Sequence, residues 1–216
     1  MDCNTIIFDM DGTVLNTLED LSVSVNYALA KLHLPERDPM EYRHFFGNGI
    51  RYAIRCAAPE GTPGETIDEL TEIYRKHYNA HCLDRTAPYE GIPELMKELK
   101  NRGYHLAIVS NKIDSAVKEL TDRFFRDTVD VAIGETEHIR RKPAPDTVLE
   151  ALRILGSKKE DAVYVGDSEV DLQTAANAGI PCLSVLWGFR DRDLLVKSGA
   201  TEMIESPEEL LRRILV

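Results

Sequence analysis

The sequence of 216 residues lacks the features of several classes of protein. No apolar run approaches the roughly 18 to 20 residues that a membrane-spanning helix needs. The amino terminus also lacks a basic region followed by a long apolar segment and a cleavage site. We therefore expect a cytoplasmic protein that has no membrane partner.

Cysteine is scarce, and its positions exclude two kinds of stabilising site. The four cysteines are Cys3, Cys56, Cys82 and Cys182. They form no Cys-x-x-Cys pair, so the sequence indicates neither a zinc site nor a disulfide framework. His77 and His81 lie four residues apart and could share a helix face, but no third ligand accompanies them.

Positive charge is in deficit, with 26 Lys and Arg against 37 Asp and Glu and a formal net charge of −11. This balance disfavours nucleic acid and anionic membranes as partners, although a local basic pocket could still hold a phosphate. With 43% hydrophobic and 29% charged residues, the chain fits a globular protein with one large core and a smaller module. We expect small-molecule partners and a monomer or a homodimer.

The stretch Thr5–Thr13 is the first that predicts chemistry. Its apolar run ends at Phe8 and suits a strand buried on both faces, and Asp9 and Asp11 follow where that strand should end. In open α/β sheets, ligands bind outside the carboxyl ends of the strands. Two carboxylates so placed repel each other unless a cation or a shared proton relieves them, which predicts a Mg²⁺ site. Gly12 allows a sharp turn, and an ordinary turn rich in Asp and Gly is the alternative.

The chain that follows this strand is predicted to be helical. Apolar residues repeat at helical spacing over residues 17–33, 40–58 and 65–82, and segments rich in proline and glycine separate these stretches. No strand signal occurs between residues 16 and 86. We therefore expect residues 16–87 to form a small all-helical cap domain, and residues 1–15 and 88–216 to form the core domain.

From residue 88 onward, predicted strands and helices alternate. The strands are expected at residues 105–110, 129–134, 162–166, 182–186 and 201–204, and the helices at 94–102, 113–123, 144–155 and 169–178. A last helix begins at Ser206, Pro207 and Glu209, which are typical of a helix start. This alternation predicts an α/β fold with a doubly wound parallel sheet, interrupted by the helical cap after the first strand.

Four motifs, in chain order, resemble those of the haloacid dehalogenase superfamily of phosphotransferases. The first is Asp-Met-Asp-Gly-Thr-Val after the opening strand. Ser110 ends an apolar run, Lys142 precedes a proline, and Gly166-Asp-Ser-Glu-Val-Asp171 follows the apolar strand Ala162–Val165. The resemblance covers the whole chain, and it implies a Rossmann-like core, a helical cap and phosphate-transfer chemistry.

The resemblance also implies catalytic roles. Asp9 would be the nucleophile that forms an aspartyl-phosphate, and Asp11 would donate a proton to the departing alcohol and later activate water. Ser110 would donate a hydrogen bond to a phosphoryl oxygen, with Asn111 as a further donor; a serine N-cap is the compatible alternative. Lys142 would place a positive charge beside the nucleophile and the phosphate, and its alternative is a solvated lysine in a basic run.

By the same resemblance, Mg²⁺ is bound by the Asp9 side chain, the Asp11 backbone carbonyl and Asp167, with waters and the substrate phosphate completing an octahedron. Asp167 and Asp171 are four residues apart, so both can point to the same side if a helix begins near residue 168. We assign Asp171 to orienting a water or a neighbour of the metal. For both residues, acidic capping of that helix is the alternative.

Specificity is expected to come from the cap. Its Gly-Asn-Gly sequence resembles a loop of phosphoglycolate phosphatase-like members that faces the active site there, and Arg51 lies close by and could pair with a substrate carboxylate. An exposed helix arginine is the alternative for Arg51. The residues expected to contact substrate are Gly12, Thr13, Asn111, Gly47, Asn48, Gly49 and Arg51.

Together these patterns predict a Mg²⁺-dependent phosphatase for a small phosphomonoester, with phosphoglycolate as the first candidate. A phosphosugar mutase of the β-phosphoglucomutase type is the nearest rival. A non-catalytic phosphate-binding regulatory protein is the alternative from another class, but such a protein would usually have lost its nucleophile or its lysine. A haloacid dehalogenase is disfavoured because it would leave Asp167 and Asp171 unexplained.

Overall fold

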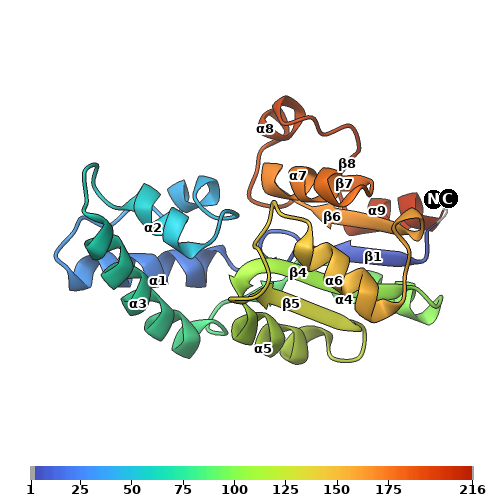
Figure 1. Cartoon of the computed structure of the whole chain (residues 1–216), viewed down its shortest axis with the longest axis horizontal. Helices are drawn as coiled ribbons and strands as arrows, with labels where there is room; N and C mark the ends of the chain where they lie inside the picture. Colours follow the sequence, from blue (N-terminus) through green and yellow to red (C-terminus); the bar gives the residue numbers. More distant parts are fainter. Residues whose placement is uncertain (1–2, 216) are drawn as a thin grey trace. The chain divides into compact units, whose positions relative to one another are not determined.

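The computed structural model describes residues 3–215 (Figure 1). The chain forms two compact units. The sheet unit contains the chain up to Leu15 together with the chain from Pro88 onward, and the helical unit contains Asn16–Ala87. Among the described residues, no helix combines the length and the apolar character that crossing a membrane requires.

A six-stranded sheet forms the centre of the sheet unit. Its strands are β1 (Thr5–Phe8), β4 (His105–Ile113), β5 (Val131–Glu135), β6 (Ala162–Gly166), β7 (Cys182–Val185) and β8 (Met203–Ile204). They lie in the order β5-β4-β1-β6-β7-β8, and the paired neighbours run parallel. The chain winds outward from β1 in one direction, returns beside β1 at β6 and then winds outward in the other. This confirms the predicted doubly wound parallel sheet, and it places the end of β1 where such sheets bind ligands.

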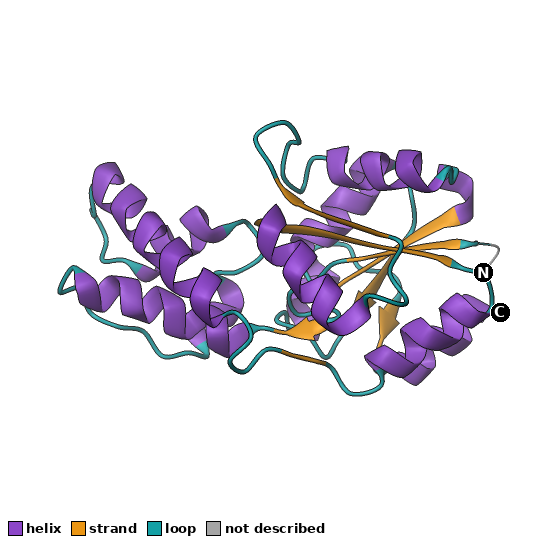
Figure 2. Cartoon of the chain, turned by 90° about the horizontal axis from the view of Figure 1, so that it is seen from below, coloured by secondary structure: helices purple, strands orange, loops and turns teal. Residues whose placement is uncertain are grey.

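Helices cover both faces of this sheet (Figure 2). The helices of the sheet unit are α4 (Ile92–Asn101), α5 (Asp114–Phe125), α6 (Asp146–Leu155), the 3₁₀ turn η2 (Lys159–Asp161), α7 (Glu169–Ala178), α8 (Arg192–Lys197) and α9 (Pro207–Leu215). Because side chains alternate along a strand, Ile6 and Phe8 join the core formed with α4, α5 and α9, whereas Ile7 joins the core formed with α6 and α7. Strand β1 is therefore buried on both faces, as its continuous apolar run predicts.

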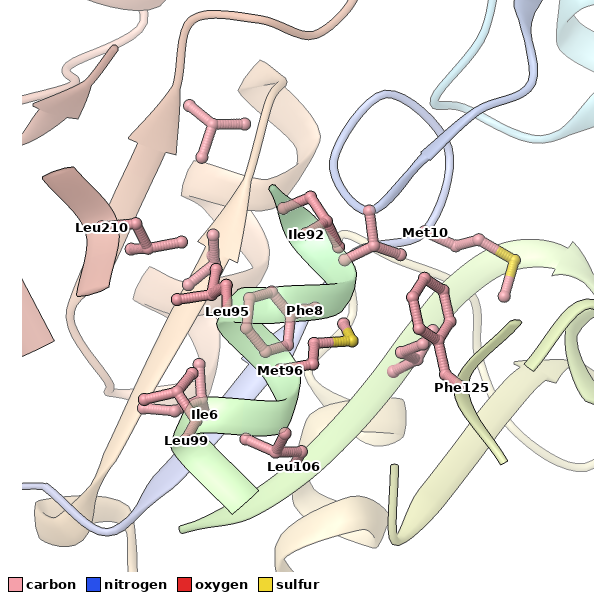
Figure 3. Packing of buried hydrophobic residues seen from close by; sticks show 14 of the residues in the cluster. Ile6, Phe8, Met10, Ile92, Leu95, Met96, Leu99, Leu106, Phe125 and Leu210 are labelled. Carbon is pink, nitrogen blue, oxygen red and sulfur yellow. The ribbon is translucent and has the colours of Figure 1, made fainter. Parts of the chain in front are cut away.

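The core on the α4 face shows how firmly β1 is held. In Figure 3, side chains of α4, among them Leu95 and Met96, lie over Ile6 and Phe8. All four are at most 3% exposed. Burying one side chain of this size contributes about 1.5–3 kcal/mol. This packing holds the end of β1 in place, and with it the residues that directly follow the strand.

The helical unit consists of α1 (Leu18–Lys31), the 3₁₀ turn η1 (Glu41–His44), α2 (Ile50–Ala57) and α3 (Gly64–His81), with α1 packed against α3. One buried carboxylate ties its two ends together. Asp20 Oδ2 accepts hydrogen bonds from the backbone N–H groups of Arg85 and Thr86 at 3.0 and 2.8 Å and from the Thr86 hydroxyl at 2.8 Å. The last residues of the unit are thereby fixed to its first helix.

The predicted helix over residues 40–58 is wrong. The chain forms η1 and α2 instead, and the segment Gly47–Gly49 separates them. Gly47 and Gly49 have φ angles of +116° and +81°, which no helical residue adopts and which glycine adopts at little cost. The apolar spacing on either side hid this break from a search for helical periodicity.

Three smaller features also differ from the prediction. Strand β4 continues beyond Ser110 to Ile113, with an irregular register after Val109. Helix α8 was not predicted, because its six residues are too few to show a helical period. Strands β2 (Leu15–Asn16) and β3 (Ala87–Pro88) pair as a small sheet of their own where the chain enters and leaves the helical unit.

Candidate active site

The turn after β1 is tight and requires glycine. The carbonyl of Met10 accepts hydrogen bonds from the backbone N–H groups of Thr13–Leu15 at 3.0 to 3.3 Å. Gly12 has a φ of +83°, and a Cβ at this position would lie 2.3 Å from Asp167 Oδ2. A side chain would therefore strain the backbone and collide with a carboxylate. The turn brings the segment after β1 against the segment after β6.

Asp9 lies at the end of β1 and is only 7% exposed. Its Oδ1 accepts hydrogen bonds from the Met10 N–H group at 2.7 Å and from Lys142 Nζ at 2.8 Å. Burial and the neighbouring charge of Asp171 raise the pKa of the Asp9 carboxyl well above its usual value, and Lys142 acts in the opposite direction. A cation added beside Asp9 would act in the same direction as Lys142 and favour the charged carboxylate.

Lys142 is buried at the centre of the site, which removes the solvated-lysine alternative. Its Nζ donates to Asp9 Oδ1 at 2.8 Å, to Asp171 Oδ1 at 2.8 Å and to the Tyr164 hydroxyl at 2.9 Å. An ammonium group has three protons, so these three acceptors match its full capacity. Burial opposes the charge of Lys142, but the carboxylates of Asp171 and Asp9 raise its pKa above the usual value. Tyr164 is a contributor that the sequence did not reveal.

Asn111 holds the backbone of Lys142 in place. Its Nδ2 donates to the Lys142 carbonyl at 2.9 Å, and its Oδ1 accepts from the Lys142 N–H group at 2.7 Å. The structure thus gives this side chain a contact that differs from the expected one with substrate, and the substrate contact stays a prediction. Ser110 is buried beside it, and its Oγ accepts a hydrogen bond from the Lys112 N–H group at 3.2 Å.

Lys112 is a site residue that sequence reasoning missed. Its side chain is buried, and its Nζ lies 3.1 Å from Asp11 Oδ1. Strand β4 continues beyond Ser110 to Ile113. A strand prediction extended by three residues would therefore have placed Lys112 at the same end of the sheet as Ser110.

Asp167 follows β6 and is held by both of its oxygens. Oδ1 accepts a hydrogen bond from the hydroxyl of the buried Thr13 at 3.2 Å, and Oδ2 accepts one from the Phe189 N–H group at 2.6 Å. Burial and the charge of Asp171 raise the pKa of Asp167 to about 7 in the absence of a metal ion, against the effects of the Phe189 N–H group and of Arg190. Thr13 thus supports Asp167, and its expected contact with substrate stays a prediction.

Asp171 combines two roles. Its Oδ2 accepts from the N–H group and the hydroxyl of Ser168, at 3.1 and 2.6 Å, which forms a capping box at the start of α7. Its Oδ1 accepts from Lys142 and, at 3.0 Å, from the Tyr164 hydroxyl. Burial raises the pKa of Asp171, but Lys142 and the hydrogen bonds from Ser168 and Tyr164 outweigh it, and the pKa is lowered. Both oxygens are engaged, which suits a residue that orients its neighbours.

The acidic side chains meet closely enough to hold a metal ion. Asp9, Asp167 and Asp171 are all buried, and each offers a carboxylate oxygen within 4.8 Å of the others. Hard oxygen ligands of this kind suit Mg²⁺, and three buried carboxylates repel one another without a cation. The donor set therefore fits a magnesium ion.

The predicted cap residues lie in the helical unit. Gly47, Asn48 and Gly49 form the turn before α2. The Nε of Arg51 donates to Asp68 Oδ1 at 2.6 Å, and both side chains are exposed. Contact between these four residues and a substrate stays a prediction.

Comparison with known proteins identifies the family. Residues 6–185 match the model of the haloacid dehalogenase-like hydrolases. The chain belongs to this family. The predicted resemblance is thereby confirmed, and so is the prediction of an enzyme of the hydrolase type. The match extends over the turn after β1, the Ser110 and Lys142 segments and the start of α7, so it contains Asp9, Lys142, Asp167 and Asp171.

Several named members of the haloacid dehalogenase-like hydrolases are similar to this chain. A phosphoglycolate phosphatase from Aquifex aeolicus is 32% identical over 185 residues, which cover 85% of each chain. A pyrophosphatase PpaX from Halalkalibacterium halodurans is 33% identical over 98% of this chain and 96% of the relative. A crystal structure of a candidate phosphoglycolate phosphatase from Lactobacillus delbrueckii subsp. bulgaricus has a TM-score of 0.95 and 36% identity over 99% of both chains. CbbY from Rhodobacter sphaeroides, in complex with phosphate, has a TM-score of 0.77 and 27% identity over 96% of both chains.

Proposed function

We propose that the protein is a Mg²⁺-dependent phosphatase that hydrolyses a small phosphomonoester through a covalent aspartyl-phosphate, with 2-phosphoglycolate as the first substrate to test. The observation that carries the proposal is the environment of Asp9. A buried carboxylate at the end of the central strand receives a hydrogen bond from a buried ammonium at 2.8 Å and lies beside two further buried carboxylates. This arrangement suits a nucleophile at a metal-assisted phosphate site.

Three groups of the sheet unit would hold the ion. They are the Asp9 carboxylate, the Asp11 backbone carbonyl and the Asp167 carboxylate, and the engaged oxygens of Asp171 support a positioning role for that residue. When bound, Mg²⁺ supplies positive charge to the phosphoryl oxygens. Lys142 adds a fixed positive charge on the nucleophile's side.

In the first half of the reaction, a carboxylate oxygen of Asp9 attacks phosphorus. The bond from phosphorus to the ester oxygen breaks, and Asp11 gives its proton to that departing oxygen. The products are the alcohol and an aspartyl-phosphate on Asp9. Lys112, whose Nζ lies 3.1 Å from Asp11 Oδ1, holds this carboxyl group at the edge of the site.

In the second half, a water molecule attacks the phosphorus of the aspartyl-phosphate, and Asp11 takes a proton from that water. The bond between phosphorus and the Asp9 oxygen breaks, inorganic phosphate leaves, and the Asp9 carboxylate is restored. The Ser110 hydroxyl, buried beside this position, would donate a hydrogen bond to a phosphoryl oxygen throughout. We assign the choice among phosphate esters to the helical unit, through Gly47–Gly49 and Arg51.

Pyrophosphate is the second substrate to test, because similarity to a protein named as a pyrophosphatase extends over 98% of this chain. A phosphate-release assay with and without Mg²⁺ should include 2-phosphoglycolate, pyrophosphate and β-glucose 1-phosphate. We expect Mg²⁺-dependent release that stops when a chelator removes the metal. Conversion of β-glucose 1-phosphate to glucose 6-phosphate faster than phosphate release would favour the mutase, and a rate unaffected by complete metal removal would contradict the metal site.

A further inference from the structure

The loop after β7 makes direct contact with Asp167 and with the turn after β1. The Phe189 N–H group donates to Asp167 Oδ2 at 2.6 Å, and Trp187 Nε1 donates to the Thr13 carbonyl at 2.9 Å. At Gly188, an added Cβ would lie 2.3 Å from Asp167 Cβ and 2.4 Å from the Gly12 carbonyl oxygen. The loop therefore leaves no space for Asp167 to shift toward it. The position of this loop therefore determines the position of the Asp167 carboxylate.

An ion pair between a buried arginine and a partly exposed glutamate fixes this loop. The Arg190 side chain is 2% exposed, and its Nε and Nη2 donate to Glu169 Oε2 and Oε1 at 2.7 and 3.2 Å. Glu169 is the first residue of α7 and lies two residues after Asp167. The two-point contact of a guanidinium with a carboxylate restrains both position and orientation. The loop and the start of α7 are thus joined on either side of Asp167.

We propose that Arg190 is a positioning residue that sets the Mg²⁺ affinity of the site, because its pair with Glu169 holds the Phe189 N–H group against Asp167. The proposal rests on the Mg²⁺ site of the proposed function and is independent of which ester is hydrolysed. Once the loop is released, Asp167 would lose one of its two hydrogen bonds and its fixed rotamer. Loss of such support to a metal ligand typically weakens metal binding by about 10- to 100-fold.

The test is Mg²⁺ binding to the full chain, measured by isothermal titration calorimetry. The emission of Trp187, the single tryptophan of the chain, gives a parallel reading from inside the loop. In Arg190→Met, we expect the Kd for Mg²⁺ to rise about 10- to 100-fold. In Arg190→Lys, which keeps the charge and loses the two-point contact, we expect a smaller rise of roughly several-fold.

Arg192 provides a matched control two residues farther along. Its Nη2 donates to Glu205 Oε1 at 2.7 Å, and its side chain is 49% exposed. Arg192→Met and Arg192→Lys remove or alter an ion pair of the same type on the same segment. We expect both control variants to bind Mg²⁺ with the Kd of the wild type.

The alternative is that Arg190 acts through charge alone. A nearby positive charge repels Mg²⁺, so Arg190→Met would then bind Mg²⁺ more tightly and Arg190→Lys would bind it as the wild type does. Either result overturns the proposal, as does an unchanged Kd together with a lower melting temperature. If Arg190→Met does not fold, Arg190→Lys decides the question in the same way. A wild type that binds Mg²⁺ but releases no phosphate from any ester would reject the proposed function and leave this proposal standing.

Discussion

One ion pair from each unit of the molecule shows how burial changes the energetic cost of charge. In the sheet unit, the side chains of Asp9 and Lys142 are 9% and 2% exposed and form an ion pair at 2.8 Å. In the helical unit, the pair of Arg75 with Glu72 has a similar distance of 2.7 Å, but its side chains are 45% and 61% exposed. Burying a charge costs several kcal/mol, whereas an exposed pair contributes about 0–1 kcal/mol. Two ion pairs of similar distance therefore differ in meaning: the buried pair marks a candidate functional site, and the exposed pair is little more than a solvated surface.

Asp20 shows that burial of a carboxylate by itself does not indicate chemistry. It is 5% exposed, yet its Oδ2 is satisfied by two backbone N–H groups and a hydroxyl. Its hydrogen bonds come from neutral donors, and they join the first helix of the helical unit to the last residues of that unit. What distinguishes Asp9 is the close approach of other carboxylates and a buried ammonium.

The largest effect is expected from Asp9→Asn. The amide keeps the size of the side chain but removes the nucleophilic charge, so turnover should fall by roughly 10³-fold or more while the fold is retained. Phosphate release and thermal unfolding measure the two effects. Glu72→Gln in the helical unit is the control and should leave both unchanged. Turnover close to that of the wild type in pure Asp9→Asn protein would contradict the covalent route.

Lys142→Met should have the largest effect on stability. It leaves Asp9 and Asp171 buried without their shared ammonium, and breaking a buried pair in this way costs about 3–5 kcal/mol. Arg75→Met, in an exposed pair, should cost less than about 1 kcal/mol. Urea unfolding of the full chain measures both free energies of unfolding. Equal losses in the two variants would remove the contrast between the units.

Asp20→Ala should lower the free energy of unfolding by about 1–3 kcal/mol, because the N–H groups of Arg85 and Thr86 lose their acceptor in a buried position. The Kd for Mg²⁺ should stay at the value of the wild type, since Asp20 belongs to the helical unit. Urea unfolding and calorimetry provide the two readings. A weaker Mg²⁺ site in this variant would mean that the two units are energetically coupled.

The smallest effect is expected from Arg51→Ala. Its pair with Asp68 is exposed and screened by solvent, so stability should hardly change. If Arg51 binds a substrate carboxylate, KM for 2-phosphoglycolate should rise roughly several-fold, and KM for phenyl phosphate, which has no carboxylate, should not. The same change in KM for both esters would exclude carboxylate recognition by Arg51.

The sheet was predictable from the sequence because its signals are local. The apolar run at residues 6–8 and the alternation of strands and helices follow from neighbouring residues, and β6 (Ala162–Gly166) and α7 (Glu169–Ala178) have the predicted bounds. The helix over residues 40–58 failed because two glycines with positive φ interrupt a continuous helical pattern. The spacing of apolar residues along the sequence carries no information on the φ angles that the fold imposes at these two glycines.

The candidate site was predictable only in part, because some of its residues gain their partners only when the chain folds. Asp9, Lys142 and Asp167 stand in motifs that resemble a known family, and the structure brings their side chains together. Tyr164 instead lies within an apolar strand and is predicted to be a core residue, and Lys112 lies beyond the predicted end of its strand at residue 110. Their partners, Lys142 and Asp11, are distant in sequence, so only the folded chain shows these contacts.

The pairing of β2 with β3 has a consequence for how this molecule can change. Paired strands lie about 5 Å apart, so the chain leaves the sheet unit at Leu15 and re-enters it at Pro88 through neighbouring positions. Neighbouring end points are what make the insertion of a domain tolerable. The whole of Asn16–Ala87 can therefore be exchanged for a graft of another size without cutting a strand of the six-stranded sheet. The helical unit and the candidate site of the sheet unit can thus be changed, in evolution or by engineering, as separate modules.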